Sequence, residues 1–254
     1  MTRTALITGA SSGLGAEFAR QLAARGMDVV LVARDRAALE AVSAEVRDAH
    51  DVAVEVLVAD LLDAEQRDAV VARLGDAQHP IDMLVNNAGY GLDLSFHTND
   101  IDDEVRHLHL HVEVAMRLVR AALPGMLQRG SGRIVNVASV AGFLPRGTYG
   151  AAKAWLLNFS RWANVRYGPE GVTVTAVAPG FVHTNFHERL GMPPGQEGVP
   201  GGMWLTAEDV VSEALRDVAR GRSVSIPSLR YKALVALARL MPDALVQRAA
   251  ERGR

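Results

Sequence analysis

The chain has 254 residues, a formal net charge of −2, 49% hydrophobic residues and no cysteine. The missing cysteines exclude disulfides, thiol nucleophiles and cysteine metal ligands, and the near balance of 27 basic and 29 acidic residues gives no reason to expect a nucleic-acid partner. No apolar run approaches the roughly 20 residues that span a bilayer, and residues 2–8 do not resemble an export signal, so we expect a cytoplasmic protein.

Strand-like and helix-like patterns alternate along the chain. The sequence predicts strands at 4–8, 28–34, 53–60, 83–88, 132–139, 171–178 and 223–227. It predicts helices from the first glycines to about Arg25 and at 36–49, 63–74, 102–128 and 149–167. Regular alternation with short connections indicates an α/β fold of the Rossmann type, with a doubly wound parallel sheet of about seven strands and helices on both faces.

A glycine-rich loop joins the first strand to the first helix. Its candidate binding residues are Gly9, Ser11, Ser12, Gly13, Leu14 and Gly15. Glycines let the backbone turn tightly and approach a pyrophosphate, and the helix N-terminus then offers free N–H groups to the anion. On spacing alone a plain tight turn is the alternative, but the position in the first βαβ unit favours dinucleotide binding. We therefore expect one dinucleotide-binding catalytic domain over residues 1–254.

The end of the second strand carries Arg34 where a NAD-preferring domain usually has an acidic residue. A guanidinium suits the 2′-phosphate of NADP(H), and the hydroxyls of Ser11 and Ser12 can add donors. Asp35 weakens this argument slightly, and Arg34 could instead be a solvated loop cation. The charge logic predicts NADP(H) in preference to NAD(H).

Six motifs in register resemble the short-chain dehydrogenase/reductase family, in its single-domain branch. They are the glycine loop, Asp60-Leu61, Asn86 to Gly89, Ser139, Tyr149 to Lys153 and Pro179 to Thr184, and the resemblance covers residues 2–227. It implies that Asp60 and Leu61 bind adenine and that Asn87, Ala88 and Gly89 border the adenine ribose. It also implies that Pro179, Gly180 and Val182 face the nicotinamide, that Thr184 binds its carboxamide or the pyrophosphate, and that the protein is a homo-oligomer.

Tyr149 and Lys153 are four residues apart, so both project from one face of a helix. A neighbouring ammonium and the positive nicotinamide ring would lower the phenol pKa, which makes Tyr149 a usable acid and base. Lys153 would also hold the nicotinamide ribose, and Ser139 would donate to the substrate oxygen. Taken singly, such a tyrosine more often packs and such a lysine is more often solvated.

Two features depart from the family. His111 stands where the family commonly has an asparagine that feeds protons to the lysine, and it either replaces that role or simply packs. Ser139 and Tyr149 are ten residues apart, about three fewer than is common, so the connecting loop is short. The pairs His107/His111 and His183/His187 have ligand-like spacing but no third ligand, and we expect no metal site.

Two further segments affect ligand access. Residues 185–205 form an irregular loop, either a lid or partly disordered, and we expect it to be the substrate-loop region. Residues 229–254 form a helical tail whose apolar stripe and basic residues could contact a membrane surface but more often pack on the domain or a neighbouring subunit.

These features together predict an NADP-dependent oxidoreductase that moves a hydride between nicotinamide and a carbonyl or secondary alcohol. Its substrate would be a mostly apolar small molecule, an expectation that rests on Phe143, Leu144, Met192, Met203, Trp204 and Leu205. The alternative is a catalytically vestigial NADP-binding sensor or scaffold, which His111 and the short loop would favour. An intact Ser139, Tyr149 and Lys153 set argues against that alternative.

Overall fold

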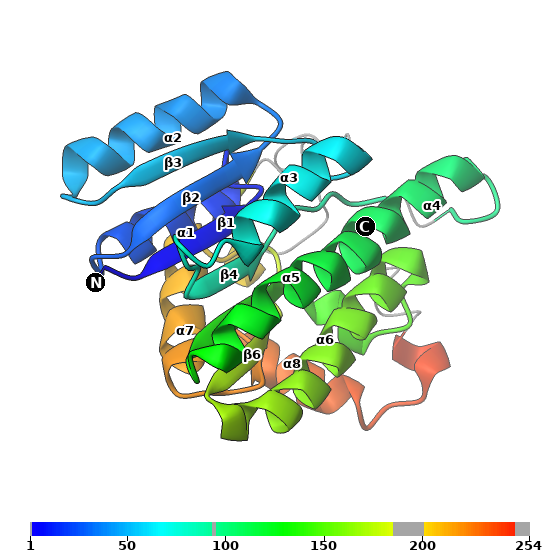
Figure 1. Ribbon diagram of the computed structural model, residues 1–254. Helices are drawn as coiled ribbons and strands as arrows, with labels where there is room; N and C mark the ends of the chain where they lie inside the picture. The colour runs from blue at the N-terminus through cyan, green and yellow to red at the C-terminus, as the bar shows by residue number, and fades with distance from the viewer. Residues whose placement is uncertain (1, 93–94, 185–200, 247–254) are drawn as a thin grey trace.

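The computed structural model describes residues 2–92, 95–184 and 201–246. Seven strands form one parallel sheet in the order β3-β2-β1-β4-β5-β6-β7 (Figure 1). The strands are β1 (Thr4–Thr8), β2 (Asp28–Ala33), β3 (Val54–Val58), β4 (Met83–Asn86), β5 (Gly132–Val137), β6 (Val172–Val177) and β7 (Val224–Ser225). This arrangement confirms the predicted doubly wound fold, and β3 and β7 are shorter than the sequence patterns indicated.

Helices cover both faces of the sheet. On one face lie α1 (Gly13–Ala23), α2 (Arg36–Ala49) and α7 (Ala207–Ala219), which share a core with the strands. On the other face α3 (Ala64–Gly75), α5 (Ala115–Gln128) and α6 (Gly147–Tyr167) form a second core. The remaining helices are α4 (Ile101–Leu108) and α8 (Leu229–Ala238). In the described part of the chain no helix combines the length and apolarity that crossing a membrane would take.

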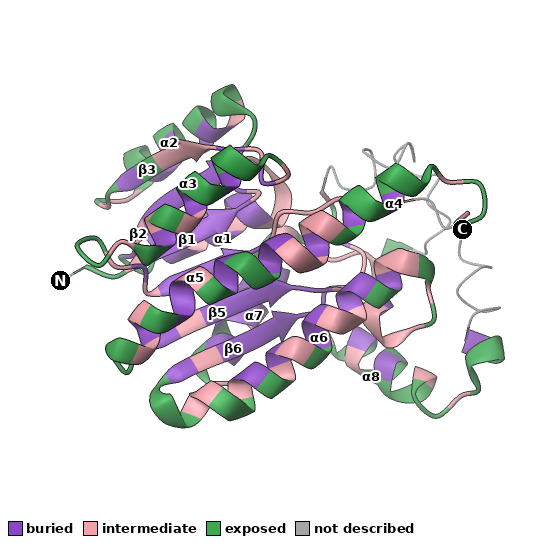
Figure 2. Ribbon diagram, turned by 45° about the vertical axis from the view of Figure 1, so that its right-hand side comes forward, coloured by how far each residue is buried: buried purple, intermediate pink, exposed green. Residues whose placement is uncertain are grey.

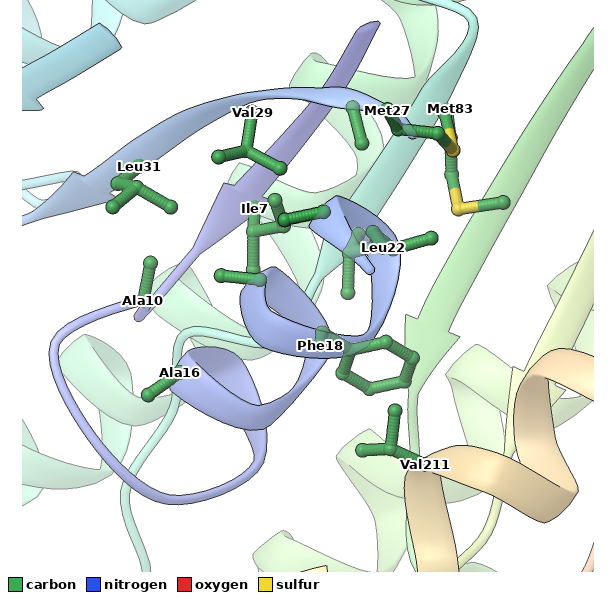
Figure 3. Packing of buried hydrophobic residues seen from close by; sticks show 14 of the residues in the cluster. Ile7, Ala10, Ala16, Phe18, Leu22, Met27, Val29, Leu31, Met83 and Val211 are labelled. Atoms are coloured by element: carbon green, nitrogen blue, oxygen red, sulfur yellow. The ribbon is translucent and has the colours of Figure 1, made fainter. Parts of the chain in front are cut away.

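The core follows from the uninterrupted apolar strands. Phe18 and Leu22 on α1 are almost completely buried and pack between β1 and α7, where Ile7 and Val211 meet them (Figure 3). Figure 2 shows the central strands as buried ribbons, with exposed residues on the outer helix faces. Strands that are buried on both faces need no polar alternation, which is why these segments read as continuous apolar runs.

Polar caps mark where several helices begin. Asp35 accepts a hydrogen bond from the backbone N–H of Ala38 (3.0 Å) at the start of α2. Thr206 accepts one from Asp209 (3.1 Å) at the start of α7. Each cap satisfies a backbone donor that has no partner within the helix.

The long helix predicted over 102–128 is interrupted. α4 ends at Leu108, a π-helical turn η1 (His109–Val114) follows, and α5 begins at Ala115. A π-turn widens the helix by one residue and shifts the faces on either side of it, and such turns are frequent at functional sites. Simple three- and four-residue periodicity does not show this interruption.

The chain reverses its winding direction at β1, between β2 and β4. In open parallel sheets a crevice forms outside the carboxyl ends of the strands at such a point. The glycine loop follows β1, the Asn86–Gly89 segment begins at the end of β4, and Ser139 follows β5, so the fold brings these segments to one edge.

Candidate active site

The glycine loop after β1 holds two backbone segments in direct contact. Gly9 and Gly13 adopt φ values of +65° and +54°, which favour glycine. A Cβ atom on Gly15 would lie 2.1 Å from the Gly9 carbonyl oxygen and 2.6 Å from Nδ2 of Asn87. Side chains at these positions would fill the space where the backbone turns into α1. The loop therefore lets a ligand approach the backbone at the start of α1, with Ser11 and Ser12 half-buried beside it.

Hydrogen bonds from Thr8 and Asn87 fasten this loop to the end of β4. The Thr8 hydroxyl donates to the carbonyl of Val85 (3.2 Å) and accepts from the backbone N–H groups of Asn87 and Ala88 (3.0 Å each). Asn87 Nδ2 donates to the Thr8 carbonyl (2.9 Å). Asn87 thus holds the strand ends together, and its partner Thr8 was not among the predicted binding residues.

Arg34 and Asp60 meet at the outer end of the crevice. Arg34 Nη1 lies 3.9 Å from Oδ2 of Asp60, and the Arg34 side chain is 71% exposed. Leu61, next to Asp60, is buried. The guanidinium is thus free to turn toward a ligand phosphate at this end, and the cradle, the cation and the adjacent carboxylate fit a dinucleotide.

The segment after β6 returns to the glycine loop. A Cβ on Gly13 would lie 3.2 Å from the side chain of Thr184, so Thr184 closes over the loop. Val182 forms a parallel bridge with Leu205, and the His183 ring stacks on Trp204 with 4.7 Å between ring centres. This contact joins residues on either side of 185–200. That segment, which contains His187 and Met192, lies outside the described residues.

Tyr231 of α8 packs against the segment that follows β6. The sequence placed this residue only in the C-terminal tail. A Cβ on Gly180 would lie 1.9 Å from the Tyr231 ring, so that position must be glycine. Phe181 donates its backbone N–H to the Tyr231 hydroxyl (3.0 Å), which donates to the carbonyl of Met203 (2.7 Å). A buried tyrosine at helical spacing gave no signal of this contact.

Ser139, Tyr149 and Lys153 come together between β5 and α6. Ser139 caps a short 3₁₀ helix η2 (Val140–Phe143) by accepting from Ala141 N–H (3.1 Å). Lys153 Nζ donates to the carbonyl of Val137 (2.8 Å) and lies 5.7 Å from the centre of the Tyr149 ring. The predicted three side chains therefore share one site despite the shortened loop.

The protein's own groups act on the pKa of the Tyr149 phenol in opposite directions. Burial raises the pKa of Tyr149, while a hydrogen bond with Ser139 and the charge of Arg146 act in the opposite direction. Burial also lowers the pKa of Lys153 to about 7. The predicted lowering of the phenol pKa relies also on a positive nicotinamide ring; for the protein's own groups, desolvation outweighs the favourable contacts. A bound positive ring would have to reverse that balance.

His111 is buried in the π-turn and faces the same site. Its Nε2 lies 2.8 Å from the carbonyl oxygen and 3.2 Å from the backbone nitrogen of Tyr90. Burial, followed by the charge of Lys153, holds the pKa of His111 well below its ordinary value. A Cβ on Gly89 would meet the imidazole Cε1 at 2.4 Å, so Gly89 makes room for the ring.

A small cavity lies between His111 and Lys153. It measures about 10 Å³, which is room for about one water molecule, and Thr8, Asn86, Leu61 and Ala88 also border it. The side-chain oxygen Oδ1 of Asn86 is buried without a hydrogen-bond partner among the described residues. The cavity is therefore polar enough to hold water between the lysine and the imidazole.

Glu104 and His107 extend this polar layer, and the sequence reading missed Glu104 entirely. Both are buried on α4; Glu104 lies about two turns and His107 about one turn before His111. The rings of His107 and His111 lie 4.2 Å apart, and those of His107 and Tyr149 lie 5.8 Å apart. Desolvation lowers the pKa of His107 to about 4. Both of its ring nitrogens lack hydrogen-bond partners within the described ranges.

Glu104 also compensates for the short loop. Its carboxylate accepts hydrogen bonds from Asn99 Nδ2 (2.8 Å) and from the hydroxyl of Thr148, the residue before Tyr149. The first turn of α6 is thereby fastened to α4. An acidic residue in an amphipathic pattern is usually solvated, so the sequence did not indicate this role.

Phe143 of the short loop faces away from the site. Its ring lies 4.8 Å from the Arg239 guanidinium and 5.7 Å from that of Arg161, and it packs against a core cluster that includes Leu156 and Leu157. Its expected contribution to an apolar substrate pocket is therefore not seen. Across the described residues, no group of three or more histidine or acidic side chains could hold a metal ion.

Comparison with known proteins gives consistent similarities. A family model described as short chain dehydrogenase matches residues 3–193. The chain is 35% identical to a 3-oxoacyl-[acyl-carrier-protein] reductase from Synechocystis sp. over 82% of this chain and 85% of the relative. Two solved structures resemble it. One is a short-chain dehydrogenase from Sphingobium yanoikuyae in complex with NADPH, with a TM-score of 0.84 and 38% identity over 93% of this chain and 94% of that chain. The other is a bulky-bulky ketone specific alcohol dehydrogenase from Comamonas testosteroni, with a TM-score of 0.80 and 33% identity over 93% of this chain and 92% of that chain.

Proposed function

The chain belongs to the short-chain dehydrogenase family, and from that premise we propose that it is an NADPH-dependent reductase of ketone or aldehyde groups on mostly apolar molecules. The observation that carries the proposal is the convergence of Ser139, Tyr149 and Lys153 beside the glycine cradle. The solved relative from Sphingobium yanoikuyae, which was obtained with NADPH, supports the choice of cofactor.

Each end of the crevice has a separate part in holding the dinucleotide. Gly9 to Gly15 would receive the pyrophosphate at the start of α1, and Asp60, Leu61 and residues 87–89 would border the adenosine. Arg34 would pair with the 2′-phosphate, which distinguishes NADPH from NADH. Pro179, Gly180, Val182 and Thr184 would line the nicotinamide end. The nicotinamide supplies a hydride when it is bound.

Tyr149 would donate its phenolic proton to the carbonyl oxygen of the substrate as that oxygen gains charge. Ser139, which already hydrogen-bonds Tyr149, would donate a second hydrogen bond to the same oxygen. Lys153 is held by its hydrogen bond to the Val137 carbonyl. When its amine is protonated, it lies close enough to Tyr149 to stabilise the phenolate. Its lowered pKa makes this charge sensitive to what binds beside it.

His111 would take part in the return of the proton. The cavity between Lys153 and His111 has space for about one water, and a water there would join the two side chains in a path for the proton. The imidazole is held neutral by burial and can both donate and accept. This geometry favours the relay role over simple packing, the two alternatives that the sequence left open.

The substrate class is supported by two observations. Phe181 and Trp204 place aromatic rings 5.7 Å apart beside Val182 and Thr184, so apolar surface adjoins the expected nicotinamide end. The named relatives act on a 3-oxoacyl group and on bulky ketones. A vestigial binding protein would need neither a Ser139–Tyr149 hydrogen bond nor a buried lysine, and we set that alternative aside.

The exposed faces of the long helices support self-association within the same proposal. Trp162 and Val165 on α6 are 54% and 79% exposed, and Met116 on α5 is 46% exposed. Apolar side chains gathered on adjacent helices are typical of subunit contacts. Size-exclusion chromatography of the wild type and a Trp162→Glu, Val165→Glu variant tests this point, and a monomeric wild type would contradict it.

The decisive experiment follows NADPH oxidation by purified protein against a panel of 3-oxoacyl thioesters, bulky aryl ketones and aliphatic aldehydes. Tyr149→Phe removes only the hydroxyl, so turnover should fall at least about a thousandfold while NADPH binding stays within about threefold. Tyr167→Phe removes a hydroxyl at the far end of α6 and serves as the matched control.

Turnover that survives in Tyr149→Phe would overturn the assignment of the proton donor. Binding of NADPH without turnover of any panel member, in the wild type as in the variant, would overturn the proposed reductase. Equal affinity for NADPH and NADH would leave the reaction class intact and refute only the cofactor preference.

A further inference from the structure

A second basic site lies far from the glycine loop, on the outer edge of the sheet. An open hollow of about 470 Å³ is lined by residues of α6, α7, α8 and the β7 edge strand. Four of its side chains are cationic: Arg161, Arg222, Lys232 and Arg239. The protein as a whole is slightly acidic, so this concentration of positive charge is local.

Two of these cations are already neutralised. Arg222 Nη1 lies 3.1 Å from the Asp217 carboxylate, and Lys232 Nζ lies 2.6 Å from the Glu213 carboxylate. Asp217 also accepts a hydrogen bond from Ser225 (2.8 Å). These pairs fix the positions of both cations at the rim of the hollow.

The other two cations, Arg161 and Arg239, have no acidic partner in the part of the chain that the structure describes. They come from α6 and from the end of α8, yet both guanidiniums lie over the ring of Phe143, at 5.7 Å and 4.8 Å from its centre. Burial, followed by the charge of Arg239, lowers the pKa of Arg161. Two like charges are therefore held together by the fold, an arrangement that an anion between them would relieve.

We propose that this hollow binds a phosphate group. Two guanidiniums offer paired N–H donors that match a tetrahedral oxyanion, and the Phe143 ring limits how their planes can turn. Val224 and Ile226 of the edge strand give the hollow an apolar wall, so the phosphate would be carried by a molecule with an apolar portion. This site is separate from Arg34 and from the cofactor cradle.

The test measures binding of inorganic phosphate and pyrophosphate to the full chain by calorimetry and thermal unfolding, at constant ionic strength with chloride. NADP⁺ is present in excess so that its own phosphate site is filled. Arg161→Gln and Arg239→Gln should each weaken phosphate binding at least about tenfold. Arg25→Gln, which alters an exposed arginine just after α1 that does not line the hollow, should bind like the wild type.

Equal phosphate binding by the wild type and both variants would overturn the proposal. So would a chloride solution of the same ionic strength that stabilises the protein as much as phosphate does. A phosphate held at the glycine loop would survive both variants, so a failure of the proposed cofactor assignment is recognised separately. Arg239 is exposed, so its variant should fold even if Arg161→Gln does not.

A lipid headgroup could supply the same phosphate, because Leu234, Leu237 and Leu240 of the neighbouring tail are exposed. Co-sedimentation with phosphatidylglycerol vesicles, against phosphatidylcholine vesicles, distinguishes this source. Vesicle binding that Arg161→Gln and Arg239→Gln abolish assigns the site to a headgroup. Binding of soluble phosphates alone assigns it to a small molecule, and binding of neither probe overturns the site.

Discussion

The glycine loop and the polar layer between α4 and α6 border the same crevice but are built by different means. In the glycine loop, backbone meets backbone: a Cβ on Gly15 would lie 2.1 Å from the Gly9 carbonyl. In the polar layer, side chains meet side chains: Glu104, His107 and His111 line one face of a helix that ends in a π-turn against Tyr149.

The difference decides how each region tolerates change. Where two backbone segments touch, only glycine fits, so the residue type is dictated by geometry. Where buried side chains satisfy one another, several combinations can position the same catalytic group, provided that buried charges and donors are paired. The first region should therefore fail when any atom is added, and the second should fail gradually.

The largest effect is expected from Gly15→Ala. The added methyl must displace the Gly9 carbonyl and Asn87 Nδ2, so the loop cannot keep the backbone shape that receives a pyrophosphate. We expect NADPH affinity to fall at least about a hundredfold and the free energy of unfolding to fall by about 1–3 kcal/mol. Fluorescence titration with NADPH and chemical unfolding measure the two effects.

Gly75→Ala is the matched control, because a Cβ at Gly75 would meet no atom within 4 Å. It should leave both quantities close to the wild type. If Gly15→Ala bound NADPH with wild-type affinity, the close backbone packing would not be what shapes the cradle.

The same contrast explains what the sequence could predict. Gly9 and Gly13 were identified because a tight turn at a phosphate loop demands glycine at fixed spacing, and Asn87 was identified through the resemblance. Ser139, Tyr149 and Lys153 were identified through the resemblance, and the i, i+4 spacing placed the last two on one face. Their spatial convergence was expected correctly, but the depth of burial, which raises the pKa of Tyr149, is a property of the packed structure that spacing does not show.

The rest of the site depends on contacts between distant segments. Glu104 reaches Thr148 across 44 residues, and Tyr231 reaches Phe181 across 50. Neither contact has a local pattern, since a glutamate on an amphipathic helix usually faces water. The π-turn at His109–Val114 is equally invisible to periodicity, because it changes the helix by a single residue.

An effect on stability that is confined to acidic pH is expected from the buried imidazole of His107. Its pKa is about 4 in the folded protein and about 6.5 when unfolded. The unfolded chain therefore binds the extra proton first, and stability falls as the pH drops from about 6.5 to about 4. The facing groups are Glu104, Lys153, His111, Tyr90 and Tyr149. The full loss in the free energy of unfolding over this pH range amounts to ~3 kcal/mol.

His107→Leu removes the titrating group and should flatten that part of the stability profile, measured by urea unfolding at pH 4, 5, 6 and 7. His97→Leu, at an exposed position, should keep the wild-type slope. A His107→Leu profile as steep as the wild type would show that other groups cause the acid sensitivity.

Arg34 should have an effect confined to one cofactor. Arg34→Gln removes a charge-assisted pair with the 2′-phosphate, so NADPH affinity should fall about tenfold while NADH affinity stays constant. Arg36→Gln alters an exposed neighbour that lies 3.8 Å from Glu40, and it should change neither affinity. A parallel loss for NADPH and NADH would mean that Arg34 supports the loop and does not recognise the phosphate.

The smallest effect is expected from Thr148→Val, which removes one hydroxyl next to Tyr149. Glu104 loses a donor, the first turn of α6 is less firmly held, and the proton donor spends less time in line with the substrate. We expect kcat to fall about three- to tenfold with NADPH affinity unchanged, and Thr148→Ser, which keeps the hydroxyl, to restore it. Glu104→Leu should act like Thr148→Val, and combining the two should cost little more than either alone, because both break the same contact. Additive losses in that double variant would mean that Glu104 acts on the site by another route, through His107.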